Sequence, residues 1–368
     1  LCEIISSRKL VVTAAKNIAA DALGGTLVFS AAQEKAMGGH QGLIAFARSL
    51  KPKLVTIIDI KANRFAIEPS LGGKVIRISL PNDDRFALTV AADLICADLS
   101  NMIAADPMTS NLLSLASRVA KSDVTVFING PTGTGKEVLA RFIHDKSARQ
   151  TFPFVAINCA AIPENMLEAV LFGHEKGAFT GASVANKGIF RAANLGTLLL
   201  DEISEMPIGL QSKILRVLQE RKVTPLGAQT EIDVDVRVLA TTNRDMRAEI
   251  QKNNFREDLF YRLNVFPMAT QSLCDRALDI LPIAVALLRK HAPSLEMIPW
   301  LSECARDALL DHSWPGNVRE LENVMQRALV LQSGGVIEAE DIIIDVAPMT
   351  QLMTSPPAQH AALSRLSS

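Results

Sequence analysis

Two groups of residues in the middle of the chain have types and spacings that suit nucleotide chemistry. The first is Gly130-Pro-Thr-Gly-Thr-Gly-Lys136-Glu137, between the apolar segment 125–129 and a helical pattern. Glycines allow a tight turn whose backbone N–H groups surround phosphate oxygens, and a lysine can reach the β and γ phosphates. The alternative is a glycine-rich turn with a surface lysine, which the strand–loop–helix order disfavours. The candidate nucleotide ligands are Gly130, Thr132, Gly133, Thr134, Gly135, Lys136 and Glu137.

The second group is the acidic pair Asp201-Glu202, which follows three consecutive leucines. A carboxylate at the carboxyl edge of a sheet can hold Mg²⁺ through water, and its neighbour can polarise the attacking water. On its own the pair could equally well open a helix, but behind a phosphate loop this is the minority interpretation. The two groups together predict nucleotide hydrolysis with Mg²⁺, with Asp201 at the metal and Glu202 at the water.

A third feature lies between these groups and suggests what the hydrolysis moves. It is the hexapeptide Gly177, Ala178, Phe179, Thr180, Gly181 and Ala182. Small residues around one aromatic side chain predict a mobile loop with a single adhesive tip, which suits contact with another protein. The alternative is a buried aromatic that anchors an ordinary loop.

The surrounding pattern predicts an α/β fold. In 106–270, apolar runs at 125–129, 154–158, 196–200 and 236–241 read as buried strands of a mainly parallel sheet, with helices at 137–148, 166–171 and 208–220. Helical periodicity at 280–291, 303–310 and 318–331 predicts a four-helix lid over 271–346. Residues 1–105 predict a small α/β regulatory module, with strands at 10–13, 26–30, 54–59 and 74–80 and helices at 42–50 and 85–96. The tail 347–368 is expected to be disordered.

Composition narrows the class of protein. The longest apolar runs of the 368 residues are too short to span a bilayer, so no membrane association is expected. Five scattered cysteines lack disulfide or zinc-ligand spacing and indicate reduced thiols in the cytoplasm. A net charge of −1 gives no support for nucleic-acid binding.

Four motifs in order, 130–137, 177–182, 198–202 and Trp314-Pro-Gly-Asn-Val-Arg319-Glu-Leu321, closely resemble the central AAA+ domain of sigma-54-dependent transcription activators. The resemblance covers about 106–345 and is greatest to the flagellar regulators of that family. It implies an AAA+ P-loop ATPase that uses ATP and Mg²⁺ and contacts sigma-54 RNA polymerase through Phe179 and Thr180. The family also has a glutamate at the position of Glu137, where other phosphate loops have Ser or Thr.

The resemblance implies further roles near the nucleotide. Asn158 matches the switch asparagine that restrains the water-activating glutamate, and Thr242-Asn243 matches the sensor I position near the γ phosphate. Arg319 matches the sensor II arginine, which reports nucleotide state to the lid. Without the family, these residues would read as a strand-end asparagine, a polar turn and a helix-capping charge.

Arg256 and Arg262 match the paired arginine fingers of the family. A guanidinium can neutralise charge that develops on the transferred phosphoryl group. Arginines six apart are more often solvated helix charges in an unknown chain. Since fingers act on a neighbouring subunit's nucleotide, the resemblance implies a ring, commonly a hexamer.

The chain departs from the family pattern in three places. The run before the lid reads Ser272-Leu-Cys-Asp-Arg276, which has one arginine fewer than the family's Pro-Leu-Arg-Glu-Arg. Residues 347–368 lack the periodicity and basic side chains of a recognition helix, so direct DNA binding is not expected. In the N-terminal module, Asp59 stands at a phosphoacceptor position, but the segment 10–15 lacks the acidic pair that would bind Mg²⁺ beside it. A degenerate, unphosphorylated receiver-like module is therefore favoured.

These features leave three functional readings in order of preference. The first is an ATPase that remodels sigma-54 RNA polymerase, as a homo-oligomeric ring or in a mixed ring with a DNA-binding paralogue. The second is a co-regulator that joins or modulates a DNA-binding activator and needs little hydrolysis of its own. The third is a general AAA+ remodelling machine, which the hexapeptide disfavours. ATPase activity of the isolated protein separates the first reading from the second.

Overall fold

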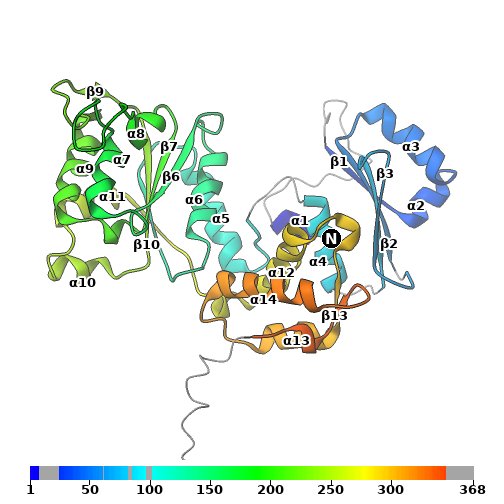
Figure 1. Ribbon diagram of the computed structural model, residues 1–368. Helices are drawn as coiled ribbons and strands as arrows, with labels where there is room; N and C mark the ends of the chain where they lie inside the picture. Colours follow the sequence, from blue (N-terminus) through cyan, green and yellow to red (C-terminus); the bar gives the residue numbers. More distant parts are fainter. Residues whose placement is uncertain (8–24, 61, 82–84, 97–101, 345–368) are drawn as a thin grey trace, which may run out of the picture.

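The structure is a computed structural model, and it describes residues 1–7, 25–60, 62–81, 85–96 and 102–344. The strand expected at 10–13 and the tail expected at 347–368 lie outside these residues. Three parts follow one another along the chain: an N-terminal module, an α/β core and a helical lid (Figure 1).

The α/β core is built on five parallel strands in the order β11-β5-β10-β7-β6. The strands are β5 (Val126–Asn129), β6 (Phe154–Asn158), β7 (Thr197–Asp201), β10 (Arg237–Thr242) and β11 (Phe266–Ala269). Four of them confirm the expected apolar runs, whereas β11 was not expected. Its Pro267 donates no backbone hydrogen bond, and the strand accordingly lies at the edge of the sheet.

Helices cover both faces of this sheet, which is why its strands are apolar throughout. Leu199 faces one layer, which includes α5 (Pro107–Val119) and α6 (Lys136–Asp145). Leu198 and Leu200 point the other way, toward a layer that includes α7, α8, α9, α10 and α11. The bounds of these helices are α7 Glu164–Phe172, α8 Gly188–Ala192, α9 Ile208–Glu220, α10 Met246–Gln251 and α11 Glu257–Leu263. Two short strands, β8 (Lys222–Val223) and β9 (Ile232–Asp233), form a separate antiparallel ribbon.

The lid contains three α-helices in its described part, where four helices were expected. They are α12 (Ile280–His291), α13 (Glu303–Asp311) and α14 (Asn317–Leu331). The lid also contains short 3-10 helices at Cys274–Asp279, Leu295–Met297 and Ala339–Asp341, and the strand pair β12 (Trp300–Leu301) and β13 (Val336–Ile337). The buried Trp314 donates from its indole nitrogen to the carbonyl of Leu309 at 2.9 Å and so joins α13 to the start of α14.

The N-terminal module has a four-stranded sheet in the order β1-β2-β4-β3, in which β3 is antiparallel to β4. Its strands are β1 (Thr26–Ser30), β2 (Leu54–Ile60), β3 (Ala66–Ser70) and β4 (Val75–Leu80). Its helices are α1 (Cys2–Ser7), α2 (Ala31–Ala36), α3 (Gly39–Leu50) and α4 (Arg85–Cys96). The edge strand β3 was not expected, because Pro69 interrupts its pattern. Asp59 lies next to the carboxyl end of β2, as the sequence indicates.

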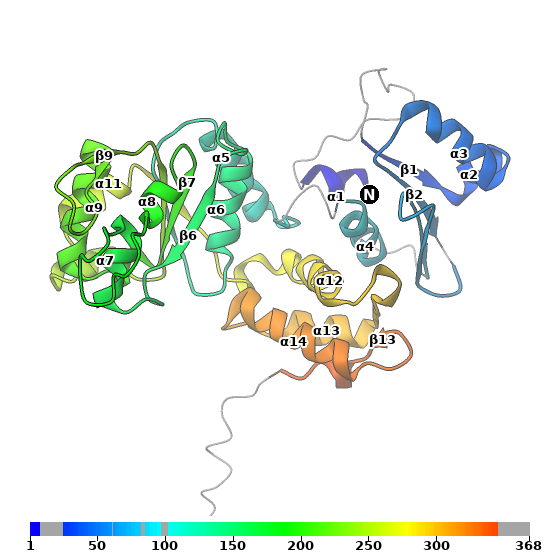
Figure 2. The same cartoon turned by 45° about the horizontal axis from the view of Figure 1, so that its top comes forward.

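This module packs on the lid, and α4 lies beside α12 in both views (Figures 1 and 2). Asp93 on α4 is buried and accepts from Nε of Arg289 on α12 at 2.7 Å. Phe65 and Phe86 contact the Trp300 ring at centroid distances of 5.1 and 5.0 Å. The two parts therefore share one hydrophobic core.

Candidate nucleotide-binding site

The site lies at one edge of the core sheet. Parallel strands bring their carboxyl ends together, and ligands of open α/β sheets bind outside those ends. Here the ends of β5, β6, β7 and β10 place Asn129, Asn158, Asp201 and Thr242 along the same edge. The phosphate loop follows β5, and the acidic pair closes β7.

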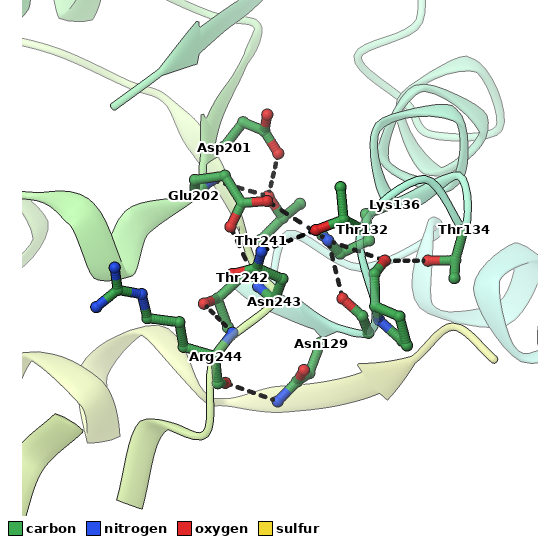
Figure 3. A network of polar contacts seen from close by, with 12 residues as sticks. Asn129, Thr132, Thr134, Lys136, Asp201, Glu202, Thr241, Thr242, Asn243 and Arg244 are labelled. Carbon is green, nitrogen blue, oxygen red and sulfur yellow. Dashed lines mark hydrogen bonds and ion pairs between the residues drawn. The ribbon is translucent and has the colours of Figure 1, made fainter. Parts of the chain in front are cut away.

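The phosphate loop 130–135 ends where α6 begins at Lys136, as expected. The ammonium of Lys136, only 7% exposed, donates to the carbonyl of Gly130 at 2.9 Å and lies 3.6 Å from Glu202 Oε1 (Figure 3). The Gly130 carbonyl therefore holds the Lys136 ammonium over the loop, where the ammonium can contact a phosphate. The loop therefore has the geometry that nucleotide binding requires.

The acidic pair divides into two environments. Asp201 accepts from Thr241 Oγ1 at 2.5 Å and from Asn158 Nδ2 at 3.1 Å. Glu202 accepts from the backbone N–H of Asn243 at 3.1 Å. Glu202 has φ of 49°, a left-handed conformation that costs a non-glycine residue about 1 kcal/mol or more. This turn directs the Glu202 carboxylate toward Lys136. The Asp201 carboxylate stays between Thr241 and Asn158 on the neighbouring strands.

The position of Asn158 differs from the expectation. It was expected to restrain Glu202, but its amide contacts Asp201 instead. The reason is the register of the sheet, in which Asn158 and Asp201 are cross-strand partners while Glu202 has already left the strand. The glutamate is held from the other side by Asn243.

Thr242 and Asn243 are both close to the site, but only one faces it. Asn243 donates from Nδ2 to Thr132 Oγ1 at 2.9 Å and so ties the end of β10 to the phosphate loop (Figure 3). The side chain of Thr242 is buried and donates to Ser204 Oγ at 2.8 Å. Thr242 therefore positions its neighbours and does not itself present a hydroxyl to the nucleotide.

Two of the expected loop ligands also need qualification. The side chain of Thr134 is buried, with its hydroxyl bonded to Pro131 O at 2.8 Å and to Thr270 Oγ1 at 2.7 Å. Only its backbone can meet a phosphate. Glu137 lies in the first turn of α6 with an exposed side chain.

The lid reaches the phosphate loop through the start of α14. The backbone N–H of Val318 donates to the Gly133 carbonyl at 3.0 Å, and Asn317 Nδ2 donates to the Thr132 carbonyl at 3.0 Å. A Cβ atom on Gly133 would lie 2.4 Å from Gly316 O, so this close approach needs a glycine. Arg319 is one residue further along α14, and its side chain is exposed beside the loop.

Arg256 is the residue just before α11, Arg262 lies in the last turn of that helix, and both residues are exposed. Arg256 pairs with Asp258 at 2.7 Å, and Arg262 donates to the Leu218 carbonyl at 2.9 Å. Within the described chain, neither arginine has a hydrogen bond or ion pair to the phosphate loop or the acidic pair of its own subunit. The structure therefore does not bring them together with Lys136 and Glu202.

The hexapeptide lies in the connection between α7 and α8. Its base is fixed, because Gly177 N–H donates to Ala182 O at 2.8 Å and His174 forms β-bridges with Asn186 and Leu226. Phe179 is 45% exposed and meets the His174 ring edge-on at 4.9 Å. The tip is thus available to a partner. Ala182 is only 6% exposed, so its side chain belongs to the base of the loop and not to the expected contact surface.

Sequence reasoning missed three residues at the site: His174 beside Phe179, Asn317 in the lid, and Arg276. Arg276 was noted only as part of an altered run, yet it is buried and donates to the Thr134 carbonyl at 2.8 Å. The retained arginine of that run therefore contacts the phosphate loop. Asn317 stands in the Trp-Pro-Gly-Asn motif, and its position there was the available signal.

Beneath the acidic pair, Cys159 follows β6 with its thiol buried. Burial, with Asp201 and Glu202 nearby, raises the pKa of this thiol to about 12. A thiolate is therefore disfavoured next to the carboxylates.

Comparison with known proteins identifies a class of protein that agrees with the geometry of the site. Residues 102–269 match the Sigma-54 interaction domain family, and residues 274–357 match the AAA+ ATPase lid domain family. The crystal structure of NtrX from Brucella abortus in complex with ATP is similar, with a TM-score of 0.61 and 25% identity over 87% of each chain. The fold and the phosphate loop thus define an AAA+ P-loop NTPase.

Two curated relatives refine this class. The chain is 49% identical to Response regulator protein FleR of Pseudomonas aeruginosa over 87% of this chain and 69% of FleR. It is 42% identical to Transcriptional regulatory protein FlbD of Caulobacter vibrioides over 87% of this chain and 72% of FlbD. The chain belongs to the family of sigma-54-dependent transcription regulators. Among the described residues, no helix is both long and apolar enough to span a membrane.

Proposed function

We propose that the protein is an ATP-hydrolysing activator that remodels sigma-54 RNA polymerase holoenzyme, so that closed promoter complexes open. The observation that carries this proposal is the cluster of Lys136, Glu202, Asn243 and Thr132 at the sheet edge. The exposed hexapeptide loop lies in the segment that connects β6 to β7. Those two neighbouring strands end in Asn158 and Asp201, so a change at the nucleotide has a short path to the loop.

In this mechanism the phosphate loop and Lys136 bind the β and γ phosphates. Glu202 polarises the water that attacks the γ phosphorus, and the products are ADP and inorganic phosphate. Arg256 and Arg262 would reach the nucleotide of a neighbouring subunit in a homo-oligomeric or mixed ring, commonly a hexamer. Their exposed positions, at the start of α11 and in its last turn, support that role. Arg319 would report nucleotide state to the lid.

Asp201 is the residue that would hold Mg²⁺. Its two oxygens already accept hydrogen bonds from Thr241 and Asn158, which suits a carboxylate that reaches the metal through water. When bound, Mg²⁺ would neutralise charge on the phosphates.

The proposed contact with sigma-54 lies at Phe179 and Thr180, both exposed at the loop tip. Similarity to FleR and FlbD supports flagellar genes as the targets. The co-regulator reading depended partly on the altered run 272–276. The contact of Arg276 with the phosphate loop weakens that argument.

A promoter-opening assay tests the function. Purified protein, sigma-54 holoenzyme and a sigma-54-dependent flagellar promoter are incubated with ATP, and melted DNA is detected with permanganate. Opening is expected with ATP and absent with a non-hydrolysable analogue. Lys136→Ala is expected to lose nucleotide binding and opening together. Unchanged nucleotide affinity in this variant would refute the assignment of the phosphate loop.

A further inference from the structure

Three successive carbonyls of the phosphate loop are held from the lid. Thr132 O accepts from Asn317 Nδ2 at 3.0 Å, and Gly133 O accepts from Val318 N at 3.0 Å. Thr134 O accepts from Arg276 Nη2 at 2.8 Å. All three donors belong to the lid or to the turn that leads into it.

Peptide geometry gives these contacts a consequence for nucleotide binding. The described chain has no cis peptide bond, and in a planar trans peptide the C=O and the following N–H point in opposite directions. The lid fixes the carbonyls of Thr132, Gly133 and Thr134. It therefore also fixes the N–H group that follows each of them, which are those of residues 133–135. Within the described residues, none of these N–H groups donates to the protein. They point away from the lid donors and remain available to phosphate oxygens.

We propose that Arg276 and Asn317 are positioning residues for the nucleotide: they hold the back of the phosphate loop so that three successive N–H groups face the phosphates. This proposal deepens the proposed function and rests on nucleotide binding at Lys136. The lid then determines the affinity of the phosphate loop for phosphate by orienting the N–H groups of that loop. This effect adds to any contact that Arg319 makes with the nucleotide.

Burial and a contact with Asp279 fix the side chain of Arg276. Its side chain is 6% exposed, and Nη1 lies 3.6 Å from Asp279 Oδ2. Asp279 is fully buried and accepts from the N–H groups of Ala105 and Asp106, each at 2.7 Å, and from Thr109 Oγ1 at 2.5 Å. The guanidinium thus joins the phosphate loop to the joint at which α5 begins. A charged donor makes a stronger hydrogen bond than a neutral one, especially away from water.

Burial and hydrogen bonds also fix the side chain of Asn317. It is buried and adopts φ of 55°, a left-handed conformation that asparagine tolerates better than most residues. Its Oδ1 accepts from Leu273 N at 2.7 Å while its Nδ2 donates to the loop. Substitution by aspartate keeps the shape and the acceptor but replaces the donor with a carboxylate oxygen that repels the Thr132 carbonyl.

Arg237 provides a matched control. It is also a buried arginine, at 2% exposure, and it donates to the carbonyls of Val119 and Ala120, each at 3.1 Å. These carbonyls end α5 and lie away from the phosphate loop. In both arginines, replacement by lysine loses the planar fork that reaches two partners at once. Only Arg276→Lys disturbs the loop.

The test is calorimetric titration of the full chain with ADP, together with thermal melting of each variant. Arg276→Lys and Asn317→Asp are each expected to raise the Kd for ADP about tenfold. Arg237→Lys is expected to lower Tm and leave the Kd within about twofold. If Arg276→Lys does not fold, Asn317→Asp carries the test.

The outcomes separate this proposal from the function on which it rests. We call the hold of Arg276 and Asn317 on the phosphate loop the clamp. Normal ADP affinity in both lid variants, with a wild type that binds ADP, would overturn the clamp alone. A wild type that binds neither ADP nor ATP would overturn both the clamp and the proposed function. In steady-state ATPase assays, the clamp predicts a raised KM with a smaller change in kcat, whereas a merely structural role predicts a loss of active protein at unchanged KM.

Discussion

Lys136 Nζ lies 3.6 Å from Glu202 Oε1, so the residue proposed for the phosphates and the residue proposed for the water are paired with each other. Both side chains are largely buried, at 7% and 17% exposure. A γ phosphate that binds Lys136 competes with this pair and frees Glu202 for the water. In the proposed mechanism, nucleotide binding and the release of the glutamate are thereby one event.

Glu202→Gln tests this relationship. Glutamine keeps the acceptor for Asn243 N–H but cannot form an ion pair with Lys136, so ATP is expected to bind at least as tightly as in the wild type. Hydrolysis is expected to fall by about a hundredfold or more, since the general base is lost. Equilibrium binding of ATP and single-turnover hydrolysis measure the two effects. Turnover within about tenfold of wild type would exclude Glu202 as the base.

Thr180→Ala tests the hexapeptide loop. The residue is exposed at the tip, and the hydrogen bonds that fix the base involve Gly177 and Ala182 instead. ATP hydrolysis is therefore expected to remain near normal while promoter opening is lost. Both are measured on the same preparation, with Val184→Ala, also exposed at 74%, as a nearby control. A collapse of hydrolysis in Thr180→Ala would mean that the loop is structural.

Arg256 and Lys136 provide a subunit-mixing test. Arg256→Ala and Lys136→Ala are each expected to be inactive alone. If Arg256 acts on a neighbour's nucleotide, mixed rings contain sites with an intact Lys136 next to an intact Arg256, and hydrolysis returns. The rate is measured against mixing ratio, with ring formation checked by light scattering. Absence of rescue in well-formed mixed rings would count against action between subunits.

Cys159 gives a prediction about thiol chemistry. Thiolates are the reactive form, and the raised pKa, about 12, keeps this thiol protonated throughout the neutral and mildly alkaline range. Iodoacetamide is expected to label the exposed Cys2, Cys274 and Cys304 but not Cys159 in the folded protein. Mass spectrometry across pH 7 to about pH 9 reads out each site. Rapid labelling of Cys159 at neutral pH would contradict its burial beside Asp201 and Glu202.

The sequence predicted the strands that carry the site because buried parallel strands are continuous apolar runs, as in the leucines of β7. It did not predict β3 or β11, since each contains a proline and lies at a sheet edge. The phosphate loop and the acidic pair were local patterns and could be read directly. The helix bounds of α12 were likewise evident from the 3.6-residue period.

Contacts between distant segments could not be read in this way. Arg276 and Thr134 are 142 positions apart, and only the folded lid brings them together. The partner of Asn158 depended on strand register, and a shift of one residue decides between Asp201 and Glu202. Likewise, the sequence showed Thr134 and Ala182 inside motifs, but only packing shows that their side chains point inward.

ATP hydrolysis by the purified protein over a series of protein concentrations, with and without sigma-54, tests the proposed activator function directly. The specific activity is expected to rise with protein concentration, because each active site of the proposed ring needs arginines from a neighbouring subunit. A rate that stays near zero at every concentration, with nucleotide binding intact, would contradict an activator that works by its own hydrolysis and would favour a co-regulator that depends on a partner subunit.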